Sequence, residues 1–134
     1  MSIPSGFRME LERRSDGAPI VTTGFECLHL YPFDDWRTVE RGIVENATEN
    51  LNSQAYQRMM ISGAAECPID KQGRMLIPQH LRDHARLDRE VTIAGVGQRI
   101  EIWDKASFEA DLKKTQANFP EIVSGMGDRS SKES

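Results

Sequence analysis

The sequence has only two cysteines, three histidines and no long apolar run. Cys27 and Cys67 are too few for a disulfide-rich secreted scaffold, and each lies in an apolar, strand-like stretch, so we expect two buried free thiols. No apolar run approaches the roughly 20 residues that span a membrane, and the N-terminus lacks a signal-peptide pattern. These absences predict a cytoplasmic protein that has no contact with a membrane.

Motifs of enzymes and cofactor sites are also missing. The sequence has no G-x-x-x-x-G-K-S/T, no G-x-S-x-G and no paired carboxylates with an obvious partner, so no enzyme, cofactor or small-molecule substrate is predicted. His80 and His84 have the four-residue spacing of metal ligands on a helix, but H-E-x-x-H is absent and the third histidine, His29, lies far away in the sequence. We therefore interpret them as ordinary surface histidines and predict no metal site.

Positive charge is not in excess either. The formal net charge is −4, which argues against DNA binding as a property of the whole molecule, because affinity for phosphate comes from cations. Residues 70–89 nevertheless hold five cations and three anions, so a local basic face is possible. The acidic excess lies elsewhere, mainly in residues 40–49 and the C-terminal third.

The most informative stretch is D-K-Q-G-R-M-L-I-P-Q-H-L-R, residues 70–82. Gly73 supplies the positive φ that a tight turn needs, and Met75–Ile77 leaves this turn as a short buried strand. Pro78 suits the first position of a helix, where its missing N–H costs nothing. Two long cations lie in the turn: Lys71 and Arg74.

The chain also contains an internal repeat. Ile3–Arg8 resembles Ile77–Arg82, and Leu30–Trp36 resembles Ile102–Phe108 at nearly the same offset along the chain. Two related halves should pack as a pseudo-dimer. The first copy starts at its Ile-Pro, so its own glycine turn and flanking strands would lie before Met1, and we expect the first half to leave strand edges unpaired.

The signature stretch resembles the MraZ family pattern D-x-K/x-G-R-x-x-I-P-x-x-x-R at seven positions, and the resemblance covers residues from about 3 to about 112. The matching residues are Asp70, Lys71, Gly73, Arg74, Ile77, Pro78 and Arg82. The resemblance implies a bacterial DNA-binding transcription regulator of the division and cell-wall gene cluster. It also implies an α+β fold made of two AbrB-like (MraZ-type) swapped-hairpin β-barrel halves in a pseudo-dimer arrangement with flanking helices.

We accordingly predict a first, N-terminally incomplete repeat over residues 1–50 and a second repeat with the intact signature over 51–118. Residues 119–134, which contain glycines and a polar run, are predicted to be a disordered tail. Helices are expected over 5–13, 33–41, 52–60, 78–85 and 105–118, with Asn52 or Ser53 capping the third and Asp104 the last. Strands are expected over 19–23, 27–31, 64–69, 74–77, 90–96 and 98–103. Repeat-equivalent aromatic residues should lie in the core or a subunit interface: Tyr31, Trp36, Trp103 and Phe108.

Two interpretations of the signature turn compete. By residue type alone, Lys71 and Arg74 would be solvated charges on a surface turn, paired with Asp70. In proteins of the MraZ family the basic residues of the turn face DNA, so the resemblance predicts DNA contacts from Lys71, Gln72 and Arg74. Arginine suits this role because its planar fork binds phosphate or the guanine edge through two hydrogen bonds.

The remaining candidate residues support or extend this turn. Gly73 shapes it, and Asp70 either orients Arg74 or holds the turn through backbone N–H groups. Arg8 and Arg82 occupy equal places in the two copies. Each either contacts DNA or pairs with a carboxylate or carbonyl near its short helix, and residue type leaves both possibilities open.

The leading functional hypothesis is a sequence-specific repressor associated with the nucleoid. It would act as a homo-oligomeric ring on repeated promoter boxes in double-stranded DNA, so that avidity offsets a small footprint per subunit. The alternative is an oligomeric swapped-hairpin scaffold or antitoxin-like module that does not bind DNA, which the acidic charge and the missing first signature favour. Salt-dependent binding to promoter DNA separates the two.

Overall fold

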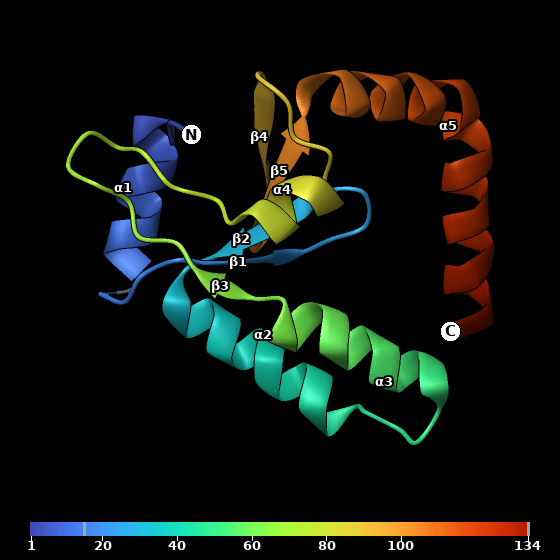
Figure 1. Cartoon of the computed structure of the whole chain (residues 1–134). Coiled ribbons are helices and arrows are strands. Elements are labelled where there is room, and N and C mark those ends of the chain that lie inside the picture. The colour runs from blue at the N-terminus through green and yellow to red at the C-terminus, as the bar shows by residue number, and fades with distance from the viewer. Residues whose placement is uncertain (15, 134) are drawn as a thin grey trace.

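A single five-stranded antiparallel sheet organises the chain, with strand order β3-β1-β2-β5-β4 (Figure 1). The computed structural model describes residues 1–14 and 16–133, with side chains through residue 126. The strands are β1 (Ile20–Thr23), β2 (Leu28–Tyr31), β3 (Ala65–Glu66), β4 (Val91–Val96) and β5 (Arg99–Asp104). The mixed α+β fold is therefore as expected, in the form of one sheet to which both parts of the chain contribute.

The middle of the sheet joins the two parts of the sequence. β2 pairs with β5 so that His29 lies opposite Glu101 and Leu28 opposite Ile102. β3 pairs with the outer edge of β1 through Glu66 and Ala65. The N-terminal strands β1 and β2 are thus flanked on both sides by strands from the second part of the chain.

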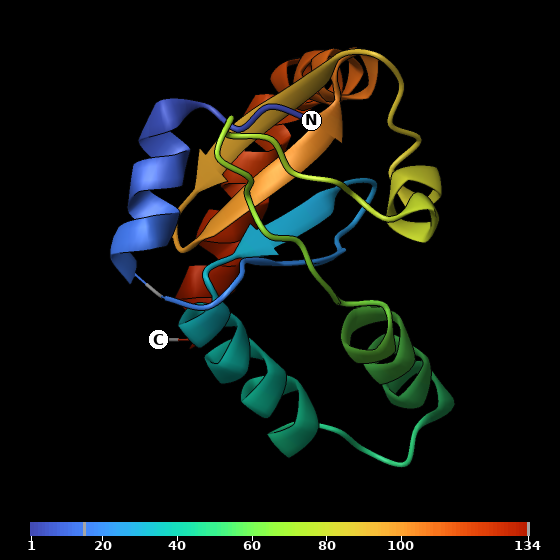
Figure 2. The same cartoon turned by 60° about the vertical axis from the view of Figure 1, so that its left-hand side comes forward.

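Helices surround this sheet (Figures 1 and 2). They are α1 (Ser5–Arg14), α2 (Phe33–Glu45), α3 (Leu51–Gln57), the π-helical turn η1 (Arg58–Ser62), α4 (Gln79–His84) and α5 (Lys105–Glu133). In Figures 1 and 2, α2 and α3 lie side by side at the bottom of the molecule, below the sheet. Among the described residues, no helix is both long and apolar enough to cross a membrane.

The main core lies between one face of the sheet, α1, α4 and the segment before α4. Leu28, Leu30 and Ile102 contribute from the sheet, while Leu11 and Leu81 contribute from the two helices, and all five are buried. A smaller cluster of Ile20, Tyr31 and Trp36 packs β1 and β2 against α2. Cys27 and Cys67 are free, buried thiols, as predicted.

Several element boundaries differ from the prediction. The strands expected over 64–69 and 74–77 shrink to β3 and to two isolated bridges, Ser2 with Arg74 and Ile69 with Met75. Prolines at both ends explain this result, because Pro68 and Pro78 have no N–H to donate to a ladder. Pro78 is the N-cap of α4 and not its first residue.

The helices also differ in length and capping. α2 extends to Glu45, where the sequence suggested an end near Arg41. The N-cap of α3 is Asn50, whose side chain accepts a hydrogen bond from the Asn52 backbone, so the predicted caps at Asn52 and Ser53 are wrong. The Asp104 cap is confirmed, because its carboxylate accepts from the backbone N–H and hydroxyl of Ser107, both at 3.1 Å.

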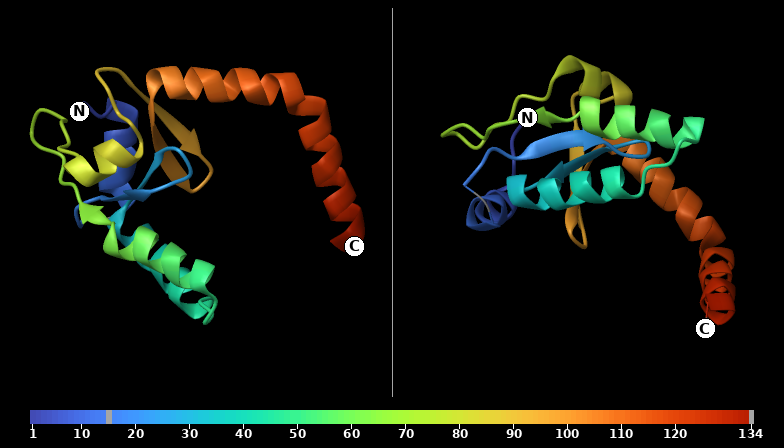
Figure 3. Two further views of the ribbon diagram at one scale, coloured as in Figure 1. Left: turned by 45° about the vertical axis from the view of Figure 1, so that its right-hand side comes forward. Right: turned by 90° about the horizontal axis from the view of Figure 1, so that it is seen from below.

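The largest difference is at the C-terminus. α5 continues to Glu133, so the helix does not end near Asn118 as predicted. Residues 119–133 are helical where a disordered tail was predicted. Ser134 lies outside the described residues. The helix contains Pro120 and bends sharply (Figure 3), and kinking is how helices accommodate proline. The sequence predicts a helix end before Pro120, but helical backbone lies on both sides of this residue.

Candidate nucleic-acid interface

The signature turn is held by its own acidic residue. Asp70 Oδ1 accepts hydrogen bonds from the backbone N–H groups of Gln72 (2.8 Å) and Arg74 (2.9 Å). The Asp70 carbonyl also accepts from Gly73, and the Asp70 N–H donates to the Arg74 carbonyl at 2.8 Å. The bond from the Arg74 N–H, followed by that from Gln72, lowers the pKa of Asp70. Of the two roles considered for Asp70, these are the contacts of a residue that fixes the turn backbone.

Gly73 has a buried position with φ of +78°. A Cβ atom added to it would lie 2.7 Å from Nη1 and 2.8 Å from Cζ of Arg8. Arg8 of α1 therefore packs directly on the turn of the second half. Its Nε atom is buried and has no hydrogen-bond partner within the described part of the chain. A side chain at position 73 would be strained by the left-handed backbone and would have to displace the Arg8 guanidinium.

The N-terminal residues hold the other side of the turn. Ile3 N–H donates to the Gly73 carbonyl at 2.8 Å, and Met75 N–H donates to the Met1 carbonyl at 2.7 Å. The terminal amino group of Met1 donates to the Met75 carbonyl at 3.0 Å. Figure 2 shows the N-terminus beside this segment. The base of the turn is thus hydrogen-bonded to the first residues of the chain, which are far from it in sequence.

The tip of the turn presents the predicted DNA-binding side chains to solvent. Lys71, Gln72 and Arg74 are exposed, and neither cation forms an ion pair with any described residue. The surface salt bridge between Arg74 and Asp70 that residue types alone suggested is therefore not formed. The turn offers two free cations and one amide on a backbone that is fixed from both sides.

The two arginines of the repeat have different surroundings. Arg8 is half-buried beneath the turn, whereas Arg82 is exposed on α4. Arg82 lines a shallow hollow with Met1, Leu76 and Arg89. The structure thus brings Arg8 to the turn and places Arg82 on a neighbouring part of the surface. The sequence alone did not separate these roles, because the packing of Arg8 depends on its contact with Gly73, which lies in the other half of the chain.

The two histidines of α4 each contact a backbone carbonyl. His80 Nε2 lies 3.0 Å from the Gly63 carbonyl oxygen, and His84 Nε2 lies 2.8 Å from that of Gly24. The two rings therefore connect α4 to different segments of the chain. His80 is exposed, as predicted, whereas His84 is half-buried, so the prediction of a surface histidine is wrong for His84.

Comparison with known proteins decides the family. A family profile described as "MraZ protein, putative antitoxin-like" matches residues 60–130. The chain is 40% identical over 127 residues to a transcriptional regulator MraZ of Pediococcus pentosaceus and 42% identical over 127 residues to that of Carboxydothermus hydrogenoformans; each match covers 94% of this chain and 86% of the relative. The chain belongs to the MraZ family. The MraZ resemblance of the signature stretch is confirmed, and the family is one of transcriptional regulators and not of enzymes.

Proposed function

We propose that this MraZ-family chain is a sequence-specific DNA-binding repressor of the division and cell-wall gene cluster, active on the nucleoid in the cytoplasm. The observation that supports this most is the signature turn, which holds Lys71, Gln72 and Arg74 exposed on a backbone fixed by Asp70 and by the N-terminal segment. Curated relatives of this chain are named transcriptional regulators, and double-stranded promoter DNA is the partner that such a name suggests.

Each side chain has a role that follows from its chemistry. Arg74 reads a base edge or a phosphate, because its fork donates two parallel hydrogen bonds and its fixed backbone limits the entropy lost on binding. Lys71 contributes a point charge toward phosphate. Gln72 can bond to adenine through its amide or to the sugar-phosphate backbone. Arg82 adds a phosphate contact from α4, while Arg8 supports the turn from beneath.

The small size of this basic surface calls for several copies at once. We propose that residues 1–50 and 51–118 form two AbrB-like halves of the swapped-hairpin type, related by an approximate two-fold axis. The pairing of His29 with Glu101 supports this. These residues are separated by the same offset that relates Leu30–Trp36 to Ile102–Phe108, so they occupy equivalent positions in the two halves. They also lie directly opposite each other, as equivalent residues on a two-fold axis do. A homo-oligomeric ring on repeated boxes would then gain affinity by avidity, since each chain alone has few cations and a net charge of −4.

The test is a titration of the Arg74→Ala protein with promoter DNA and with scrambled DNA at two salt concentrations. If Arg74 reads a guanine edge, we expect a loss of about 1–3 kcal/mol on the promoter and relaxed base preference at one position. If it contacts phosphate, affinity falls equally on all sequences and the salt slope falls by about one unit. Arg41→Ala is the matched control, because Arg41 is an exposed arginine on α2, which is a different element from the turn.

Folding is checked by circular dichroism, and both variants should retain the wild-type spectrum because both side chains are exposed. Unchanged DNA binding by a folded Arg74→Ala protein would contradict the proposed use of the turn. The second candidate function, an oligomeric scaffold or antitoxin-like module, would then be favoured. Its support is the acidic net charge of the chain and the description of the matching family as antitoxin-like.

A further inference from the structure

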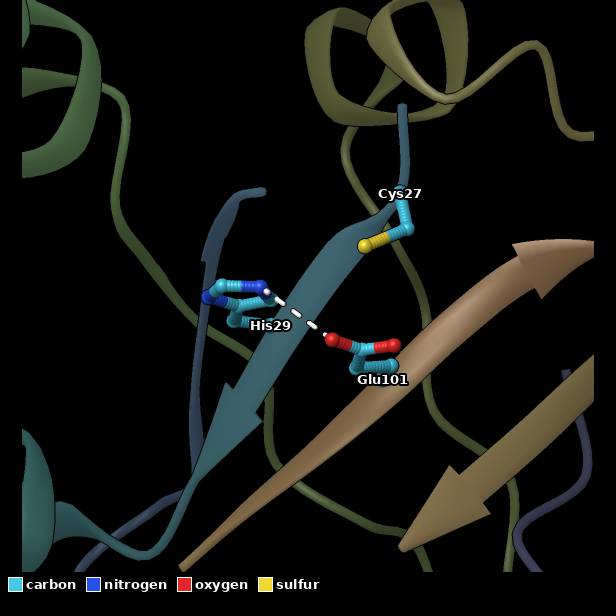
Figure 4. Close-up of side chains that lie close together, drawn as sticks. All are labelled: Cys27, His29 and Glu101. Atoms are coloured by element: carbon cyan, nitrogen blue, oxygen red, sulfur yellow. Dashed lines mark ion pairs between the residues drawn. The ribbon is translucent and has the colours of Figure 1, made fainter. Parts of the chain in front are cut away.

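Strands β2 and β5 and the residue just before β2 bring a thiol, an imidazole and a carboxylate together on one face of the sheet (Figure 4). His29 of β2 lies opposite Glu101 of β5, and Cys27 precedes His29 by two residues. One ligand atom from each lies within 4.8 Å of the other two. The distance from His29 Nε2 to Glu101 Oε2 is 3.7 Å. Sequence analysis missed this group because its members come from different halves of the chain and meet only through the strand register.

Neighbouring side chains orient the imidazole and the carboxylate. The Tyr31 hydroxyl lies 3.4 Å from His29 Nδ1, Trp103 Nε1 donates to Glu101 Oε1 at 3.0 Å, and Arg99 donates to Glu101 Oε2. If Nδ1 carries the proton that the Tyr31 oxygen accepts, the lone pair of Nε2 faces a carboxylate oxygen. In that tautomer a cation can lie between the two acceptor atoms beside the Cys27 thiol, whereas with the proton on Nε2 the imidazole faces the carboxylate as a donor. Outer partners of this kind are typical of histidine and carboxylate ligands.

The space around the group is kept clear by a glycine. A Cβ atom on Gly24 would lie 2.5 Å from His29 Nε2 and 3.0 Å from Cys27 Sγ. Any larger residue would therefore push against two of the three side chains. The side chains of His29 and Glu101 are 17% and 13% exposed, so solvent reaches both, while Cys27 is buried.

We propose that Cys27 Sγ, His29 Nε2 and Glu101 Oε2 bind one Zn²⁺ ion, with water as the fourth ligand. The set of one thiolate, one imidazole and one carboxylate is the N/S/O chemistry that Zn²⁺ takes. Zn–ligand lengths of about 2.0–2.3 Å in a tetrahedron place ligand atoms roughly 3.3–3.8 Å apart, so the 3.7 Å pair already has a suitable separation. On binding, the Cys27 S–H bond breaks, an S–Zn bond forms and one proton goes to solvent.

Such an ion would join β2 to β5 at the centre of the sheet. These strands belong to the two parts of the chain and pair through only three residues each. Arg99 Nη2 lies 2.8 Å from Glu101 Oε2 and balances the charge of this carboxylate, and Arg99 and Trp103 together hold it in place. The predicted role is structural: it stabilises the contact between the two halves and is independent of the DNA-binding turn.

Cobalt(II) titration of the purified, metal-free protein tests this site, because a thiolate ligand gives a charge-transfer band that oxygen and nitrogen ligands do not. We expect this band to saturate at one Co²⁺ per chain and to be displaced by Zn²⁺. Cys27→Ser should abolish it, whereas Cys67→Ser should keep it, since Cys67 is an equally buried free thiol outside the group. No band in the wild-type protein, or a band lost in Cys67→Ser instead, would overturn the site.

Further variants test the site without a substitution at the buried Cys27, which could disturb folding. His29→Asn and Glu101→Gln change partly exposed side chains, and each should weaken Zn²⁺ binding at least about tenfold in calorimetry while the fold is kept. The double variant His80→Gln/His84→Gln should bind Zn²⁺ as the wild type does, because those rings contact separate carbonyls. Full affinity in folded His29→Asn, or loss of binding in the His80/His84 variant, would place the ion elsewhere and reject the proposal.

Discussion

The guanidinium of Arg8 occupies the space into which a side chain at Gly73 would have to extend. This contact couples α1 in the first part of the chain to the exposed turn in the second. The sequence predicted different roles for the two residues, with Gly73 shaping the turn and Arg8 as a candidate for DNA contact, yet they lie in van der Waals contact. The turn is therefore a composite structure, and its stability depends on residues far from it in sequence.

The first prediction concerns Gly73→Ala. The left-handed backbone alone should cost about 1–2 kcal/mol for a residue with a Cβ, and displacement of Arg8 should add to this. Gly97→Ala is the matched control, because Gly97 has φ of +61° but no atom within 4 Å of an added Cβ. Urea denaturation should show a larger loss of stability for Gly73→Ala. Equal losses would mean that the contact with Arg8 contributes nothing.

The second prediction concerns pH. Because the pKa of Asp70 is lowered by backbone hydrogen bonds in the folded chain, its carboxylate stabilises the fold above the unfolded pKa and loses this effect as the pH falls through the folded value. The stability difference between wild type and Asp70→Asn should thus be present at neutral pH and shrink on acidification below about pH 4. Chemical denaturation across this range measures it. A difference that does not change with pH would contradict the assignment.

The third prediction concerns Thr22, which is fully buried. Its hydroxyl donates to the Met60 carbonyl in η1 at 2.7 Å, connecting β1 to the π-helical turn. Thr22→Val keeps the shape but leaves this carbonyl without its donor, so we expect a loss of about 1–3 kcal/mol. Thr23→Val should cost less, because the hydroxyl of Thr23 contacts the Met59 carbonyl at 3.2 Å in a partly buried site. Thermal unfolding that ranks them in the opposite order would refute this account.

The fourth prediction concerns the free thiols. Burial raises the pKa of Cys27 to about 12 and that of Cys67 to about 11. Since the thiolate is the reactive form, metal-free folded protein should react slowly with an alkylating reagent at mildly alkaline pH and rapidly in denaturant. Mass spectrometry after timed quenching follows both sites. Fast modification of either thiol under native conditions would show that the segment around it opens readily.

The parts of the fold that sequence predicted correctly depend on local chemistry. Gly73 has the positive φ expected for a tight turn, and Asp104 caps α5 as expected of an aspartate at the end of a strand. The hairpin of β4 and β5 follows from alternating apolar residues around Gly97. Each of these features is determined within a few residues, so the residue types sufficed.

The missed features depend on contacts between distant segments. Residues 74–77 have the composition of a strand, but Met1–Ile3 are their hydrogen-bond partners and the pairing stops after isolated bridges. The position of Arg8 under the turn and the meeting of His29 with Glu101 both require the tertiary register. Residue type gives no information on such register, so the candidate DNA-binding residues were found through the family pattern and the thiol-imidazole-carboxylate group was not found.

The strand order has a consequence for synthesis on the ribosome. β1 and β2 are synthesised first. β3, the outer neighbour of β1 in the sheet, follows only after α2, α3 and η1. β5, the outer neighbour of β2, is complete only at Asp104. A nascent chain that ends before β5 carries a strand edge with unpaired backbone groups, which invites pairing with other chains. Stalled or truncated translation products of this gene should therefore aggregate and depend on chaperones, whereas in the folded structure β3 and β5 cover the outer edges of β1 and β2.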